Sequence, residues 1–154
     1  KLAGAEVLLL TRSPEKQVLG LNIGADYAVG TESEVRNIWP EGADLVVECA
    51  GVSATVTLSH KLARSGGRVV ILGVISQGEQ VPIEPFDMLF REIQMHFSFL
   101  NPFTHERAAK MIADGTINVS SLISRIISLE EAALAISSPP PKGEVRAIVV
   151  PKHD

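Results

Sequence analysis

The sequence has a single cysteine among its 154 residues. One thiol allows no disulfide within the chain and no multi-cysteine zinc site, which is typical of a reducing compartment, so we expect a cytoplasmic location. No apolar run approaches the roughly 18 residues of a transmembrane helix, and no N-terminal segment has the layout of a signal peptide. With 14 basic against 18 acidic residues, the net charge of −4 argues against nucleic acid or an anionic membrane as partner.

The sequence also has no initiator methionine and few aromatic residues, with one Trp, one Tyr and five Phe. It opens at Lys1–Gly4, a pattern that predicts the last turn of a helix followed by its C-terminal glycine. We therefore expect a fragment of a longer protein. Its 45% hydrophobic content is still enough for a sizeable core, which argues against wholesale disorder.

Apolar runs rich in β-branched residues alternate with helical patterns, which is typical of βα units around a parallel sheet. Ser13-Pro14-Glu15 is a helix start with a serine cap and proline at the first helical position. The predicted fold class is α/β, a doubly wound parallel sheet. The strands expected in this part are 6–10, 26–29, 44–49 and 68–72, and the helices are 14–22 and 53–63.

The pattern changes after Gly73. Residues 75–86 are expected to form a loop with a short extended piece, whereas residues 92–99 alternate strictly between polar and apolar and predict a half-exposed edge strand. Ser128 and Glu131 form the sequence pattern of a capping box. The other elements expected here are a helix over 104–113 and a strand over 145–150.

Thr11, Arg12 and Ser13 follow the first predicted strand directly, and Lys16 comes one helical turn later. In doubly wound nucleotide-binding folds, an acid at the end of the second strand binds the adenosine ribose. No acid stands at this place. Two hydroxyls, a guanidinium and the free N–H groups of a helix start suit a phosphate instead. The alternative is an ordinary serine cap beside an exposed arginine.

Small residues recur where predicted strands end, at 49–51, 72–74 and 99–101. Ligands of open parallel sheets lie across the carboxyl ends of the strands, where glycine lets a cofactor approach the backbone. Each glycine alone is more often a simple turn. Their recurrence at successive strand ends is what indicates a ligand site.

The remaining candidates are weaker. Cys49 is expected to be a small packed residue rather than a nucleophile, and Glu48 a buried, hydrogen-bonded acid without a catalytic role. Arg146 fits either a surface position or a phosphate contact. No metal-ligand spacing connects the four histidines, which are His60, His96, His105 and His153.

Several runs in the same order resemble the medium-chain, zinc-dependent alcohol dehydrogenase family, and the likeness covers nearly the whole chain. The segment 97–123 is most similar to its polyol and threonine dehydrogenase branch. The runs that carry the resemblance include Lys1–Ala5, Thr11–Lys16, Ile23–Tyr27, Asp44–Gly51, Gly66–Val70 and Leu129–Ala132.

The resemblance implies a set of cofactor contacts. The family's ribose-binding acid falls at Thr11, and its replacement, with Arg12 and Ser13 alongside, favours NADP over NAD. Lys16 matches a ribose-contacting lysine, and Arg146 matches an arginine that binds the pyrophosphate. The turn at Ala50 and Gly51 would border the adenine. The nicotinamide would be lined by Leu72, Gly73, Val74, Phe99 and Leu100.

The resemblance also implies what the chain lacks. The family's G-x-G-x-x-G phosphate loop, its first strand and the domain with the zinc ligands would all precede Lys1, so the fragment alone is expected to be inactive. Residues 1–117 would form the cofactor domain without its first strand, and 118–154 would return to the absent catalytic domain. Family dimers join through the strand that matches 92–99. The parent would transfer a hydride between an alcohol or polyol and NAD(P). The alternatives are a zinc-free quinone or enoyl reductase of the superfamily, and a non-catalytic NADPH-binding module.

Overall fold

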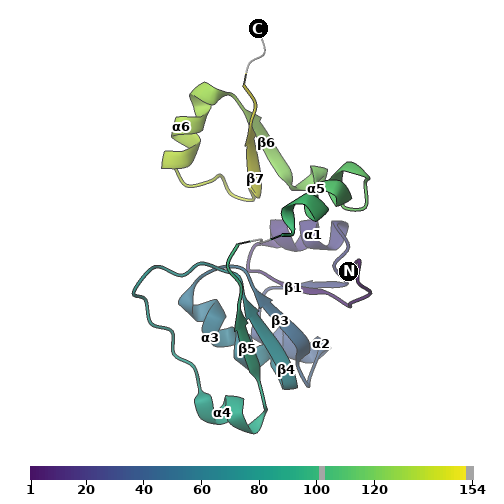
Figure 1. Ribbon diagram of the computed structural model, residues 1–154, viewed down its shortest axis with the longest axis vertical. Helices are drawn as coiled ribbons and strands as arrows, with labels where there is room; N and C mark the ends of the chain where they lie inside the picture. The colour runs from purple at the N-terminus through teal and green to yellow at the C-terminus, as the bar shows by residue number, and fades with distance from the viewer. Residues whose placement is uncertain (101–102, 152–154) are drawn as a thin grey trace. The chain divides into compact units, whose positions relative to one another are not determined.

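The computed structural model describes residues 1–100 and 103–151. The chain divides into two compact units. Unit 1 comprises residues 1–30 and 103–154, and unit 2 comprises residues 31–102 (Figure 1). Asn101 and His153, which the sequence analysis mentioned, lie outside the described residues.

The first part of unit 1 is a parallel βαβ arrangement. Strand β1 (Leu8–Leu10) pairs in parallel with β2 (Tyr27–Val29), and helix α1 (Pro14–Asn22) connects them. Ser13 caps α1 as predicted, because its hydroxyl accepts a hydrogen bond from the Lys16 N–H. The helix ends before Gly24, whose positive φ of 107° suits glycine.

The second part of unit 1 holds another parallel βαβ arrangement. Strand β6 (Ile123–Ile127) and strand β7 (Arg146–Val149) pair in parallel, and α6 (Leu129–Ser137) lies between them in the sequence (Figure 1). Helix α5 (His105–Ala113) and a 3-10 turn (Ser120–Leu122) precede β6. The capping box of Ser128 and Glu131 is confirmed. The sequence analysis assigned no strand to β6.

Unit 2 is built on a three-stranded parallel sheet in the order β3–β4–β5, as Figure 1 shows. Its strands are β3 (Ala43–Glu48), β4 (Ala63–Ile71) and β5 (Gln94–Phe97), and its helices are α2 (Glu32–Ile38), α3 (Ser53–Leu62) and α4 (Pro85–Phe90). The buried core consists of Val56, Ala63, Val69 and Ile71. Helix α3 packs on β3 and β4 and covers this core.

These pairings confirm the predicted fold class. In the doubly wound order 3-2-1-4-5-6, strands 2 and 3 are neighbours, as are strands 4, 5 and 6. The pairs β1–β2 and β3–β4–β5 have this relationship, and all are parallel. In unit 2, β5 is an edge strand, as the alternating pattern predicted.

Three local expectations were incomplete. Helix α2 was not expected, although Thr31 caps it in the same way as Ser13 caps α1. Residues 85–90 form helix α4, so the last two residues of the loop predicted over 75–86 belong to the first turn of this helix. Helix α3 ends at Leu62, within one residue of the prediction, but strand β4 begins at Ala63 and not at residue 68, because Ala63 already pairs with Ala43 before a register shift in the ladder.

Candidate functional site

The predicted site residues fall in both units. The residues in unit 1 are Thr11, Arg12, Ser13, Lys16 and Arg146. Those in unit 2 are Ala50, Gly51, Leu72, Gly73, Val74, Phe99 and Leu100.

Thr11 and Ser13 link the end of β1 to the start of α1. The Thr11 N–H donates to the Val29 carbonyl at 2.9 Å, which extends the β1–β2 ladder by one bond. The Thr11 carbonyl accepts from the Gln17 side chain at 2.7 Å, and its hydroxyl accepts from the Ser13 N–H at 3.4 Å. These bonds fix the loop so that the N-terminal end of α1 follows the strand directly.

Glu15 already places a negative charge at this helix start. Its carboxylate accepts from the Ser13 hydroxyl at 2.8 Å and pairs with Lys142 at 3.1 Å. The backbone at the helix start, Ser13 and Lys142 together lower the pKa of Glu15 from 4.5 to about 2. From the sequence, Glu15 was expected only as an acid in the first turn of the helix. The hydrogen bond that its carboxylate accepts from the Ser13 hydroxyl was not predicted.

Arg12, Lys16 and Arg146 are exposed cations. None of the three side chains has a hydrogen bond or ion pair with another residue within 1–100 and 103–151. Arg146 stands at the start of β7, opposite Ile123. Because no described residue neutralises their charges, Arg12 and Lys16 remain available to an anionic ligand beside α1.

Glu48 organises the turn that follows β3. Its side chain is 4% exposed, and its Oε1 accepts three hydrogen bonds. The donors are the Ala50 N–H at 2.8 Å, the Gly51 N–H at 3.0 Å and the Thr55 hydroxyl at 2.7 Å. The buried, hydrogen-bonded acid expected from the sequence is therefore present, and its partners are the candidate turn itself and the first turn of α3.

Gly51 and Gly73 allow the turns after β3 and β4 to touch. The Leu72 and Gly73 N–H groups donate to the Glu48 carbonyl at 2.8 and 3.0 Å. A Cβ on Gly51 would lie 2.6 Å from the Val74 carbonyl oxygen, and a Cβ on Gly73 would overlap the Gly51 backbone and the Glu48 carboxylate. These two glycines thus allow the turn after β3 to approach the turn after β4 closely. The sequence analysis had assigned such glycines to the approach of a cofactor.

The surface beside this contact is apolar. Ala50, Val52, Leu72 and Val74 are exposed there, while the Ala50 and Gly51 N–H groups point inward to Glu48. Cys49 is also exposed, contrary to the expectation of a packed residue. Cys49 directly follows β3 and continues the alternation of Leu45 and Val47, which are nearly half exposed because α3 covers the opposite face of the strand.

Phe99 and Leu100 follow the end of β5. The Ser98 N–H donates to the Ile71 carbonyl at 3.0 Å, which carries the β4–β5 ladder beyond the strand. The Phe99 and Leu100 side chains are exposed, and Leu100 adopts a left-handed backbone with φ of 58°. Both residues therefore lie at the carboxyl end of the sheet of unit 2, the end that the sequence analysis assigned to a ligand.

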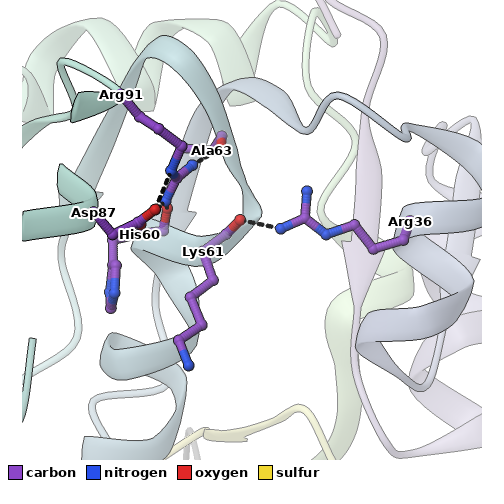
Figure 2. Close-up of polar contacts among 6 residues, drawn as sticks. All are labelled: Arg36, His60, Lys61, Ala63, Asp87 and Arg91. Atoms are coloured by element: carbon purple, nitrogen blue, oxygen red, sulfur yellow. Dashed lines mark hydrogen bonds and ion pairs between the residues drawn. The ribbon is translucent and has the colours of Figure 1, made fainter. Parts of the chain in front are cut away.

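A second polar cluster, which the sequence analysis did not anticipate, surrounds the C-terminal end of α3 (Figure 2). The Arg91 guanidinium donates to the His60 and Ala63 carbonyls at 2.9 and 2.7 Å and forms an ion pair with Asp87. Arg36 donates to the Lys61 carbonyl. The two arginines satisfy carbonyls that the end of a helix leaves free. This cluster stabilises the helix end.

The His60 ring is the exception in this cluster. His60 is 1% exposed, and neither ring nitrogen has a hydrogen-bond partner among the residues that the structure describes. Burial lowers the pKa of His60, and the nearby Asp87 carboxylate opposes that shift. Burial thus disfavours the charged form of the ring.

The described ranges, 1–100 and 103–151, contain no group of three or more His, Cys, Asp or Glu side chains arranged to hold a metal ion. The same residues include no helix with the length and apolar character needed to cross a membrane.

Comparison with solved structures identifies a close match. A protein from Sinorhizobium meliloti 1021, assigned as a zinc-binding dehydrogenase and crystallised with NADP, is 49% identical with a TM-score of 0.91. The match covers 97% of this chain and 46% of that protein.

Curated relatives include polyol dehydrogenases. D-arabinitol dehydrogenase 1 of Uromyces fabae is 28% identical, over 85% of this chain and 40% of its own length. Sorbitol dehydrogenase of Mus musculus is 26% identical, over 89% of this chain and 40% of its own length. The chain thus spans less than half the length of these relatives. A family model described as zinc-binding dehydrogenase matches residues 1–128. The chain belongs to the zinc-binding dehydrogenase family.

Proposed function

We propose that this chain is the cofactor-binding portion of an alcohol or polyol dehydrogenase that transfers a hydride between a secondary alcohol and NADP. The observation that carries the proposal is the pair of unneutralised cations, Arg12 and Lys16, at the start of α1, where an NAD-binding site would have an acid. The NADP bound to the Sinorhizobium protein and the polyol substrates named for the two relatives support it.

Arg12 and Lys16 would bind the phosphate on the adenosine ribose, with Thr11 and Ser13 shaping the loop that carries them. The Ser13 hydroxyl now donates to Glu15, so it would have to turn away from that carboxylate to reach the ligand. The α1 N-terminus would add the positive end of its dipole. Arg146 would bind the pyrophosphate.

The turns of unit 2 would meet the uncharged parts of the cofactor. Ala50 and Gly51 would border the adenine, and Leu72, Gly73, Val74, Phe99 and Leu100 would line the nicotinamide. Their exposed apolar surface fits these rings, and their position at the carboxyl end of a parallel sheet is the usual place for such ligands.

A zinc ion bound in such an enzyme would polarise the substrate oxygen as a Lewis acid. Its ligands would lie outside this chain, in the domain that the family resemblance places before Lys1. Within the chain, residues 1–117 would form the cofactor domain, and 118–154 would return to the catalytic domain. A homo-oligomer joined through the segment 92–99 fits the edge position of β5 and the exposed Phe97. Its location would be the cytoplasm, which the single cysteine supports.

Replacing Arg12 by Ala tests the proposal. In the full-length protein that contains these residues, the NADPH dissociation constant should rise about 10-fold or more, because a charge-assisted phosphate contact is lost. The NADH dissociation constant should change less than about twofold. The control is Arg107→Ala, an exposed arginine on α5, which should alter neither value. Equal losses for both cofactors would contradict the phosphate assignment.

A further inference from the structure

The Glu48 carboxylate holds the turn after β3 in one conformation. It gathers two backbone donors, from Ala50 and Gly51, and a third donor from the Thr55 hydroxyl on α3. A buried carboxylate at the end of an apolar strand is costly unless such donors surround it. The conformation of the Ala50–Gly51 turn therefore depends on the buried Glu48 carboxylate.

We propose that Glu48 is a positioning residue for cofactor binding, which fixes the Ala50–Gly51 turn against Gly73 and Val74. The proposal rests on the proposed function, because it concerns the same turns. Glu48 is not a catalytic residue, since its carboxylate is buried behind the turn and faces the chain's own amides.

The Glu48 carboxylate also determines which chemistry the turn can offer. Free N–H groups at a strand-end turn attract phosphate, but those of Ala50 and Gly51 are already used by Glu48. What remains on the outside is the apolar surface of Ala50, Val52 and Val74. The turn therefore selects an uncharged ring of the cofactor, and the anionic parts must be bound elsewhere.

The hydrogen-bond geometry gives a matched pair of variants. Oε1 accepts all three close bonds, whereas Oε2 accepts only a long one, from the Gly51 N–H at 3.3 Å. A glutamine oxygen at the Oε1 position can keep the three close bonds without the charge. Glu48→Gln should therefore preserve the turn, and Glu48→Ala should release it.

The experiment measures dissociation constants for NADPH and NADH, and the cofactor KM and kcat, in the full-length protein. Glu48→Ala should weaken both cofactors by the same factor, about 10-fold, because the turn does not touch the ribose phosphate. The cofactor KM should rise with kcat within about twofold of the original. Glu48→Gln should stay within about threefold of the original dissociation constants. Hydrogen exchange at the Ala50 and Gly51 amides should rise in Glu48→Ala alone.

Glu79→Gln, which removes one exposed acid from the same unit, is the matched control and should change none of these values. If Glu48→Ala does not fold, Thr55→Val removes only the hydroxyl donor and should weaken both cofactors a few-fold. A protein that binds neither cofactor before mutation contradicts the proposed function. A protein whose NADPH affinity is unchanged by Glu48→Ala and, where needed, by Thr55→Val contradicts the positioning role alone.

Discussion

Glu48 and His60 are both buried polar side chains of unit 2, at opposite ends of helix α3. Glu48 precedes the helix and is 4% exposed, and His60 lies in its last turn and is 1% exposed. Three donors from the turn and from α3 surround the Glu48 oxygens. The His60 ring has no hydrogen-bond partner among the described residues, although its backbone carbonyl binds Arg91.

The hydrogen bonds of Glu48, and their absence at the His60 ring among the described residues, show which of the two buried groups fixes the backbone around it. A buried carboxylate oxygen that accepts three close hydrogen bonds fixes the groups that donate them, so the conformation of the turn depends on Glu48. An imidazole without partners fixes nothing and must stay neutral to remain buried. The N-terminal end of α3 is therefore held by the buried Glu48 side chain. Its C-terminal end is held by Arg36 and Arg91, which donate hydrogen bonds to carbonyls there.

The largest expected effect comes from filling the contact next to Glu48. Gly73→Ala places a Cβ against the Gly51 backbone and the Glu48 carboxylate, so the two strand-end turns must separate. We expect the free energy of unfolding to fall by about 3 kcal/mol, measured by urea denaturation.

Gly78→Ala is the control for this substitution. Gly78 has a positive φ of 84°, and a Cβ there would meet nothing within 4 Å. The expected cost is therefore only the strain of a left-handed residue, about 1 kcal/mol. Equal costs at both positions would show that overlap with the Glu48 carboxylate and the Gly51 backbone is not what matters at Gly73.

At the other end of α3, Arg91→Ala should lower the free energy of unfolding by about 2 kcal/mol. The substitution removes two hydrogen bonds to the carbonyls of His60 and Ala63 and leaves Asp87 without its partner. Arg64→Ala, which breaks a more exposed ion pair with Asp44, should cost less than about 1 kcal/mol in the same assay. A loss at Arg91 no larger than at Arg64 would contradict its role at the helix end.

The lowered pKa of the buried His60 ring predicts that the stability of the protein falls at acid pH. Burial lowers the pKa of His60 in the folded protein, so the unfolded chain binds a proton more readily as the pH falls below about 6.5. The Asp87 and Glu84 carboxylates oppose the shift, and Lys61 and Arg91 add to it. His60 therefore makes its full contribution to the free energy of unfolding above the pKa that it has in the unfolded chain. That contribution is lost as the pH falls toward its lower pKa in the folded protein.

His60→Leu tests this through urea denaturation at about pH 7.5 and pH 5.5. The variant should lose less stability on acidification than the unmutated protein, because the apolar side chain takes up no proton. His96→Gln, at an exposed position on β5, should leave the pH dependence unchanged. An unaltered pH dependence in His60→Leu would show that the buried ring is not the group that titrates.

The smallest change in the free energy of unfolding is expected from a substitution of Glu92, the residue after Arg91. Glu92 has a φ of 53° just after α4, where its N–H donates to the Leu89 carbonyl. Glu92→Gly should raise the free energy of unfolding by about 0.5–1 kcal/mol, because glycine adopts this conformation without strain. Glu79→Gly, which has no positive φ, should not be stabilising. A destabilising Glu92→Gly would mean that its side chain supports the Arg91 end of α4.

Much of the fold could be predicted from local patterns. The uninterrupted run Val69–Leu72 predicted a strand, and Ser13 and Ser128 predicted helix starts, because hydrophobic periodicity and caps act over a few residues. Thr31, followed by Glu34 three residues later, carried the same signal for α2 and was not used. Short elements such as α4 and β6 depend on pairing and packing with distant segments.

The candidate site was only partly predictable for the same reason. That Glu48 would be buried and hydrogen-bonded followed from its place in an apolar strand. That it would meet Gly73 depends on the β3–β4 register, which places Glu48 opposite Ile71. The Arg91 contact with the His60 carbonyl joins residues 31 positions apart, and no local pattern encodes it.

We propose that NADPH contacts the Glu48 end of α3 in unit 2 and the start of α1 in unit 1, and that it does not contact the His60 end of α3. Backbone amide shifts in the isotope-labelled full-length protein, followed by NMR during titration with NADPH, test it most directly. We predict saturable shifts at Ser13 and Lys16 in unit 1 and at Gly51 and Gly73 in unit 2, and none at Lys61 or Arg91. Shifts confined to Lys61, Arg91 and their neighbours would contradict the account.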